Sequence, residues 1–208
     1  MKKGYFISVE GTDGSGKSTQ IELLNEYFKK TDKDFIYVRE PGGTSISEQI
    51  RGMILNKDNA EMCPQTEMLL YAAARAQLIH QVIIPALNEG KIVICDRFVD
   101  SSFAYQSFGR GIPLETVMSV NDSAVDGVMP DLTLLFDLSP EDAALRRKER
   151  GEAEDRLESE SGKFHADVYR GYKTLADMMS DRIKVIDARM SREEIHKEVI
   201  RLIEELLA

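Results

Sequence analysis

A short glycine-rich stretch near the start of the chain has the residue types and spacing of a phosphate-binding loop. The pattern G-x-x-x-x-G-K-[ST] is matched by Gly11, Thr12, Asp13, Gly14, Ser15, Gly16, Lys17 and Ser18, and Thr19 follows directly. Glycine lets the backbone come close to a ligand, so that successive N–H groups can point at phosphate oxygens. The Lys17 amine then reaches the β- and γ-phosphates, and the Ser18 hydroxyl can bind Mg²⁺. The pattern predicts a nucleoside triphosphate site; the alternative is a glycine-rich surface turn.

The residues on either side of this loop favour the triphosphate site. Residues 5–9 are typical of a short buried strand. Residues 18–30 are typical of a helix, because Ile21, Leu24 and Phe28 recur at helical spacing. The loop therefore lies between a strand and a helix, as phosphate-binding loops of this kind do.

The rest of the chain alternates between short apolar strands and helices. Four more strands are predicted at residues 35–38, 91–95, 132–136 and 183–186, with helices at 45–55, 65–88, 114–125 and 164–179 and others beginning after Ser139 and Ser191. Ser45 with Glu48, and Ser191 with Glu194, have the spacing of capping boxes. Alternating elements of this kind predict an α/β fold with a parallel sheet that helices cover on both faces.

The predicted topology brings distant polar residues together. Right-handed crossovers place the loops after the first three strands at one edge of the sheet. Lys17, Arg39 and the pair Asp96–Arg97 should therefore converge. Asp96 ends an apolar strand, where an acidic residue of phosphate-transfer proteins helps to hold Mg²⁺. Arg97 follows it and can grip a substrate phosphate with two parallel hydrogen bonds.

A second group of cations lies in a charged stretch, at about residues 146–160. It contains Arg146, Arg147, Lys148, Arg150 and Arg156, interleaved with acidic residues. Charge alone would favour an exposed, solvated helix face. Gly14 brings no charge to the phosphate-binding loop, however, and phosphoryl transfer needs a cation near the transferred group. We therefore predict that this stretch is a mobile lid that supplies arginines and excludes water when it closes.

Composition limits the other possibilities. The 208 residues are enough for a single domain that includes the lid, and 42% of them are hydrophobic. A formal net charge of −9 gives no overall attraction to nucleic acid or to an anionic membrane. The two cysteines, Cys63 and Cys95, show no metal-binding spacing and fit a reducing compartment. With no leader or membrane-spanning apolar run, we expect a cytoplasmic protein.

Several blocks together resemble bacterial thymidylate kinase, and they occur in the order found in that family. They are residues 6–19, Arg39-Glu40-Pro41-Gly42-Gly43-Thr44, Tyr71-Ala72-Ala73-Ala74-Arg75, residues 96–106 beginning Asp96-Arg97-Phe98, Gly109-Arg110-Gly111, Pro130-Asp131-Leu132-Thr133 and Glu154-Asp155-Arg156-Leu157-Glu158. The resemblance implies a five-stranded sheet, a homodimer, and transfer of the γ-phosphoryl group of ATP to dTMP. It implies ATP and dTMP as substrates, with Mg²⁺ held by Ser18 and Asp96.

The same resemblance assigns roles to individual residues. Residues 11–19 would bind ATP. Asp13 would organise the sugar side of dTMP, and Arg51 and Arg97 would hold its phosphate in a pocket that Glu40 lines. Tyr71 would stack on thymine, Tyr105 would disfavour ribose, and the base would be bonded by Arg75, Ser102 and Gln106. Lys17, Arg97, Asp13, Arg147 and Arg150 are the implied catalytic group, and Arg146 is another lid candidate.

Two alternatives stay open at this point. Tyr71 and Arg75, four residues apart, are more often a packing pair than a base site. A kinase for another nucleoside monophosphate, such as UMP or CMP, also fits the sequence. A binding module that hydrolyses nucleotide slowly would share the phosphate-binding loop. Residues 56–59 read Asn-Lys-Asp-Asn rather than the guanine-reading N-K-x-D, and the basic lid favours phosphoryl transfer.

Overall fold

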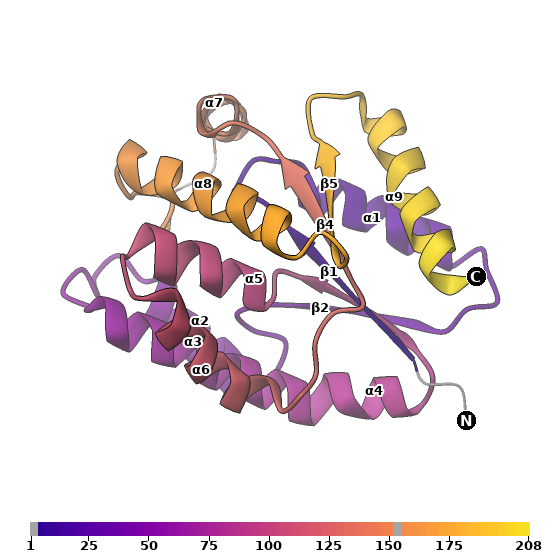
Figure 1. Ribbon diagram of the computed structural model, residues 1–208, viewed down its shortest axis with the longest axis horizontal. Helices are drawn as coiled ribbons and strands as arrows, with labels where there is room; N and C mark the ends of the chain where they lie inside the picture. Colours follow the sequence, from indigo (N-terminus) through magenta and orange to yellow (C-terminus); the bar gives the residue numbers. More distant parts are fainter. Residues whose placement is uncertain (1–3, 152–154) are drawn as a thin grey trace.

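The computed structural model describes residues 4–151 and 155–208 (Figure 1). Its core is one parallel sheet with the strand order β2-β3-β1-β4-β5. The strands are β1 Tyr5–Glu10, β2 Phe35–Arg39, β3 Ile92–Asp96, β4 Leu132–Asp137 and β5 Ile183–Asp187. The predicted α/β fold with five parallel strands is therefore confirmed. Within the described ranges, none of the helices is long and apolar enough to cross a bilayer.

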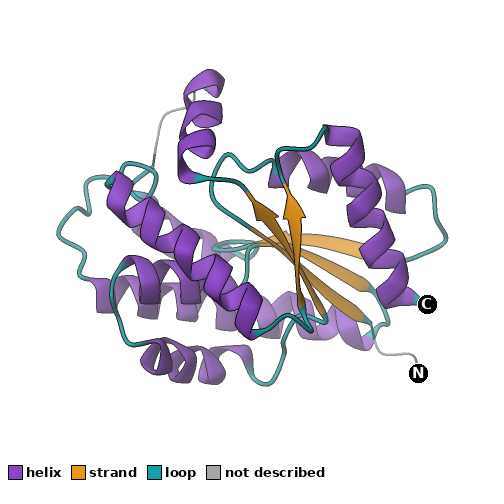
Figure 2. Cartoon of the chain, turned by 45° about the horizontal axis from the view of Figure 1, so that its top comes forward, coloured by secondary structure: helices purple, strands orange, loops and turns teal. Residues whose placement is uncertain are grey.

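The helices cover both faces of the sheet (Figure 2). Their bounds are α1 Lys17–Phe28, α2 Ser45–Leu55, α3 Pro64–Leu78, η1 Ile79–Ile83, α4 Ile84–Asn88, α5 Val99–Ser102, η2 Phe103–Gly109, α6 Leu114–Val125, α7 Pro140–Arg150, α8 Gly162–Met178 and α9 Arg192–Leu207, where η1 and η2 are π-helical. The predicted helix at 65–88 is thus α3, η1 and α4 in succession. The predicted charged helix ends at Arg150, and residues 156–159 form turns.

The sheet has a hydrophobic core on each of its two faces, because successive side chains of a strand point to opposite sides of the sheet. Phe6 belongs to the core that α3, α6 and α8 share, whereas its neighbour Ile7 belongs to the core that α1 and α9 share. The same alternation places Val93 and Ile94 of β3 in different cores. Strands buried on both faces explain the continuous apolar runs in the sequence.

One predicted helix start is displaced by a residue. The structure confirms the capping box of Ser191 with Glu194. The expected box of Ser45 with Glu48 is wrong, because Thr44 is the N-cap and its hydroxyl accepts from the backbone N–H of Ser47 at 3.1 Å. The Glu48 carboxylate instead accepts from the backbone N–H of Gly43 and pairs with Arg39.

The register of the sheet aligns the ends of three neighbouring strands. Asp96 of β3 lies opposite Val9 of β1 and Arg39 of β2. The three residues therefore mark one carboxyl edge of the sheet, and the loops that leave this edge can share a cleft.

Candidate active site

The phosphate-binding loop connects β1 to α1 and packs against α7. Gly14 has a φ of 96°, and a Cβ at this position would lie 2.6 Å from the carbonyl oxygen of Ala143. A side chain at position 14 would therefore push α7 away from the loop. Arg147 of α7 donates from Nη1 to the carbonyl of Asp13 at 2.8 Å. Gly14, which brings no charge to the loop, thus allows Arg147 of the predicted lid to approach the loop.

Lys17 is held inside the loop in the absence of a phosphate. Its buried amine donates to the carbonyls of Gly11 and Thr12, both at 2.9 Å, and lies 3.9 Å from the Asp13 carboxylate. Burial, assisted by the Arg97 charge, lowers the pKa of Lys17 to about 8. The negative charge of a bound triphosphate would favour the cationic form of this amine.

This lowered pKa makes the binding of ATP sensitive to pH. The amine is cationic below its pKa and neutral above it, and only the cation attracts phosphate. We expect kcat/KM for ATP to fall as the pH rises through about 8, since this ratio reports the ionisation of the free enzyme. A Lys17→Arg variant carries a guanidinium that stays charged, so its profile should lack this step. If the step persists in that variant, another group causes it.

Asp13 and Arg97 form a tight ion pair between the loop and the end of β3. Arg97 Nη2 lies 2.5 Å from Asp13 Oδ1, and Arg97 Nη1 donates to Ser101 and Tyr172 at 3.1 Å. Although burial opposes it, the charges of Arg97 and Lys17 hold the pKa of Asp13 well below its usual range. Arg97 has a φ of 67°, a left-handed conformation that is costly for a side chain. Such strain persists where the surroundings fix the residue.

Ser18 and Asp96 line the same cleft, whose volume is about 840 Å³. The Oδ1 atom of Asp96 is buried and has no hydrogen-bond partner among the described residues. An unpartnered carboxylate oxygen beside a serine hydroxyl fits Mg²⁺, which proteins bind through one or two groups together with phosphate and water. Both predicted magnesium ligands therefore line the same cleft.

A smaller cavity of about 100 Å³ adjoins this cleft and shares Asp13 and Arg97 with it. Its walls hold eight of the nine residues predicted for the acceptor, which are Asp13, Glu40, Arg51, Tyr71, Arg97, Ser102, Tyr105 and Gln106. Burial raises the pKa of Tyr71 and of Tyr105 far above neutral, so both phenols stay protonated. The cleft and the cavity thus meet where a phosphate could pass between two ligands.

Arg75 is the predicted acceptor residue that does not line this cavity. Its guanidinium is 1% exposed. It pairs with Glu40 at 2.6 Å, donates to Ser102 at 3.0 Å and to the Phe98 carbonyl at 3.1 Å, and also contacts Asn121. Arg75 lies behind the cavity wall and fixes two residues that form it.

The lid cations have different surroundings. Arg147 lies on the phosphate-binding loop, and its Nε is buried without a partner among the described residues. Arg146 lines the cleft and donates to the Ala188 carbonyl at 2.9 Å. The Arg150 side chain and residues 152–154 lie outside the described part of the chain.

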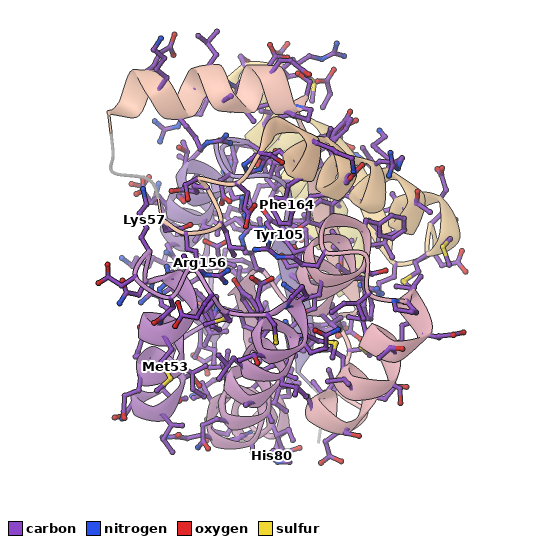
Figure 3. All side chains as sticks on the ribbon, turned by 90° about the vertical axis from the view of Figure 1, so that its left-hand side faces the viewer. Met53, Lys57, His80, Tyr105, Arg156 and Phe164 are labelled. Atoms are coloured by element: carbon purple, nitrogen blue, oxygen red, sulfur yellow. The ribbon has the colours of Figure 1, made fainter. Side chains whose placement is uncertain are left out.

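Arg156 is buried (Figure 3), whereas Arg146 and Arg147 are half-buried. Arg156 donates from Nε to the Ile54 carbonyl at 2.7 Å and pairs with Glu67 at 2.6 Å. Its backbone N–H also bonds to the Leu55 carbonyl. Arg156 therefore attaches the end of the predicted lid to α2 and α3, and it does not face the cleft.

Sequence reasoning gave no role to several residues in and around the site, among them Glu10, Asp155 and Leu157. Glu10 is fully buried and accepts from the Phe98 backbone at 2.7 Å, from Ser101 at 2.6 Å and from Tyr172 at 2.9 Å. Burial raises the pKa of Glu10 to about 6. An acidic residue at the end of an apolar strand was the available signal. Asp155 and Leu157 also line the smaller cavity, and their signal in the sequence was the block of residues 154–158 that resembles the family.

Known proteins of one family match the chain along its length. The family model described as thymidylate kinase matches residues 9–199. A thymidylate kinase of an Exiguobacterium strain is 52% identical over 197 residues, covering 95% of this chain and 92% of the relative. That of Clostridium novyi is 48% identical over 200 residues, covering 96% and 98%.

A solved structure agrees with these sequence matches. The crystal structure of thymidylate kinase from Ehrlichia chaffeensis superposes with a TM-score of 0.78 at 32% identity, covering 97% of this chain and 99% of that one. The fold, the phosphate-binding loop and the paired cavities are thus accompanied by similarity over nearly the whole length. The chain belongs to the thymidylate kinase family.

Proposed function

We propose that the chain transfers the γ-phosphoryl group of ATP to dTMP, giving dTDP and ADP. The observation that carries this proposal is the meeting of two cavities at Asp13 and Arg97. The larger one is lined by the phosphate-binding loop, and the smaller one by aromatic and amide side chains suited to a nucleoside. A donor and an acceptor bound there would present their phosphates to each other.

The reaction needs positioning and charge neutralisation more than a nucleophilic side chain. A dTMP phosphate oxygen forms a bond to the γ-phosphorus while the bond to the β–γ bridging oxygen breaks. Residues 11–19 would hold the triphosphate, with Lys17 on its terminal phosphates. Mg²⁺, held by Ser18 and Asp96, would neutralise charge on the phosphates. Arg97 would hold the acceptor phosphate in line.

The lid would complete the cation shell around the transferred group. Residues 146–160 are proposed as this lid within a single domain of residues 1–208. Among the lid arginines whose side chains the structure describes, Arg147 has the surroundings that best support a catalytic role. It already contacts the loop, and its buried Nε has no hydrogen-bond partner in the described part of the chain. Arg150 is proposed beside it on its position in the sequence alone.

The acceptor cavity suits a deoxyribonucleoside monophosphate. Tyr71 would stack on thymine, and Ser102 and Gln106 would meet its edge. Arg75, which lies behind the cavity wall, is proposed to position Glu40 and Ser102 rather than to contact the base. Arg51 is proposed to assist Arg97 with the phosphate. The Tyr105 hydroxyl donates to the Asp13 carboxylate at 3.3 Å, which supports the proposal that its ring lies against the sugar.

A change at Tyr105 tests the choice of sugar. Tyr105→Ala should raise kcat/KM for ribothymidylate relative to dTMP by about tenfold, because removing the ring opens space for a 2′-hydroxyl. Tyr105→Phe keeps the ring and should keep the preference for deoxyribose. Steady-state ADP release with both acceptors measures the ratio. An unchanged ratio in the alanine variant would count against the steric role.

A nucleotide-hydrolysing binding module is the alternative from another class. It would consume ATP without an acceptor, whereas a kinase needs one. ADP release from ATP and Mg²⁺, measured with and without dTMP, separates the two. Release that does not depend on dTMP would refute the proposed transfer.

We also propose that the chain forms a homodimer. Exposed apolar side chains on neighbouring helices support this, namely Ile46 and Met53 on α2 and Leu69 on α3 (Figure 3). Each is more than half exposed, which is unusual for residues of this size.

The thiols of Cys63 and Cys95 are both free and support a reducing location such as the cytoplasm.

A further inference from the structure

Glu67 of α3 is a fully buried carboxylate beneath the acceptor cavity. It accepts from Arg110 Nε at 3.1 Å through Oε1 and from Arg110 Nη2 at 2.8 Å through Oε2. Arg156 donates to Oε2 at 2.6 Å, and the Gln106 amide donates to Oε1 at 3.1 Å. Two guanidinium groups and one amide therefore converge on a single carboxylate.

The ionic surroundings keep this carboxylate in its acceptor-only form. Although burial opposes it, Arg110 and Arg156 lower the pKa of Glu67. Glu160 pairs with Arg110 at 2.6 Å, so the cluster contains two carboxylates and two guanidinium groups. An ionised carboxylate offers only lone pairs to its neighbours.

This property fixes the orientation of the Gln106 amide. An amide that faces an acceptor must turn its NH₂ group toward it. The Oε1 atom of Gln106 is then left as the other end of the amide, and within residues 4–151 and 155–208 the side chain of Gln106 forms its hydrogen bond through Nε2 and not through Oε1. Gln106 lines the acceptor cavity and sits in η2, a π-helical segment of the kind often found at functional sites.

We propose that Glu67 is a positioning residue for base selection. It holds the Gln106 amide so that its carbonyl oxygen is available to the base, where it accepts the N3–H of thymine. Cytosine has an unprotonated N3, which would meet the same oxygen as a second acceptor and leave both without a proton. This inference rests on the proposed function and adds to it the origin of the preference for a base that carries N3–H.

The substitution Glu67→Gln tests the proposal because it is nearly isosteric and supplies a donor. Oε2 accepts from two guanidinium groups, whereas Oε1 accepts from one guanidinium N–H and the Gln106 amide. The new NH₂ group should therefore take the Oε1 position, where fewer guanidinium donors oppose it. Gln106 would then turn its oxygen toward that group and present NH₂ to the base.

The readout is the ratio of kcat/KM for dTMP to that for dCMP, measured by ADP release. In E67Q we expect the ratio to fall at least about tenfold, with kcat/KM falling for dTMP and rising for dCMP. Glu160→Gln removes the other carboxylate on Arg110 without a contact to Gln106, so it should keep the wild-type ratio. A loss of lid attachment through Arg156 would affect both acceptors equally and leave the ratio unchanged.

A double-mutant cycle tests whether Glu67 acts through Gln106. In the Gln106→Ala background, E67Q should no longer change the ratio. If E67Q folds, as judged by circular dichroism, and keeps the wild-type ratio, the proposal is wrong. It is also wrong if E67Q shifts the ratio as strongly in the Q106A background. A wild-type protein that does not use dTMP would instead refute the proposed function, so the two failures are distinguishable.

Discussion

Replacing Arg97 by alanine should lower kcat about a thousandfold, a loss of ~4 kcal/mol of transition-state stabilisation. Arg97 lies where the two cavities meet and pairs with Asp13 at 2.5 Å. In the proposed reaction it neutralises the acceptor phosphate and aligns its oxygen. Arg97 contacts the donor loop of residues 11–19 at the side chain of Asp13. The phosphates of ATP would be held by the backbone N–H groups of the loop and by Lys17 instead, so the affinity for ATP should change by less than about threefold.

The conservative change at the same position separates charge from geometry. Arg97→Lys keeps the positive charge but loses the planar pair of donors, so it should recover only part of the lost kcat. Alanine and lysine meet the same cost at a φ of 67°, since both carry a Cβ. Backbone strain therefore does not distinguish the two variants. A kcat near the wild-type value in Arg97→Ala would contradict the assigned role.

Replacing Lys17 by alanine should also lower kcat/KM for ATP by about a thousandfold. The amine is the buried cation of the phosphate-binding loop, and its two carbonyl partners belong to that loop. Phosphate oxygens would replace those carbonyls as its partners. Without the amine, both the charge and a stabilising contact of the loop are lost.

An exposed lysine serves as the matched control. Lys33 pairs with Glu204 at 3.4 Å and lies outside the cleft lining, so Lys33→Ala should keep wild-type kinetics. Thermal unfolding of Lys17→Ala shows whether loss of activity reflects loss of the fold. A folded Lys17→Ala variant with nearly normal turnover would refute the proposed phosphate cradle.

The features that local patterns determine could be predicted from the sequence. Each strand is an apolar run, and the phosphate-binding loop is a contiguous motif, so neither depends on distant contacts. The convergence of Lys17 with Asp96 and Arg97 followed from the handedness of crossovers. The observed parallel sheet, with the order β2-β3-β1-β4-β5, places those loops at one edge.

The features that were missed depend on contacts between distant residues. Arg156 lies in the same basic stretch as Arg147, yet it is buried and pairs with the carboxylate of Glu67, which is 89 residues away in the sequence. Arg75 lies behind the cavity because Asn121, 46 residues away, and Glu40 hold it there. The helix start at Thr44 was missed because the Glu48 carboxylate accepts from the Gly43 backbone N–H and pairs with Arg39, instead of capping the helix with Ser45. No spacing rule contains these partners.

The most direct test of the account measures ADP release from ATP and Mg²⁺ with each of dTMP, dUMP, UMP, CMP, AMP and GMP supplied separately. We predict that dTMP gives the highest kcat/KM, because Tyr71, Gln106 and Tyr105 line the acceptor cavity and are proposed to stack on the base, to accept its N3–H and to exclude a 2′-hydroxyl. A preference for another monophosphate would contradict the assignment of the base pocket. If none of the six supports turnover, the kinase function itself is contradicted.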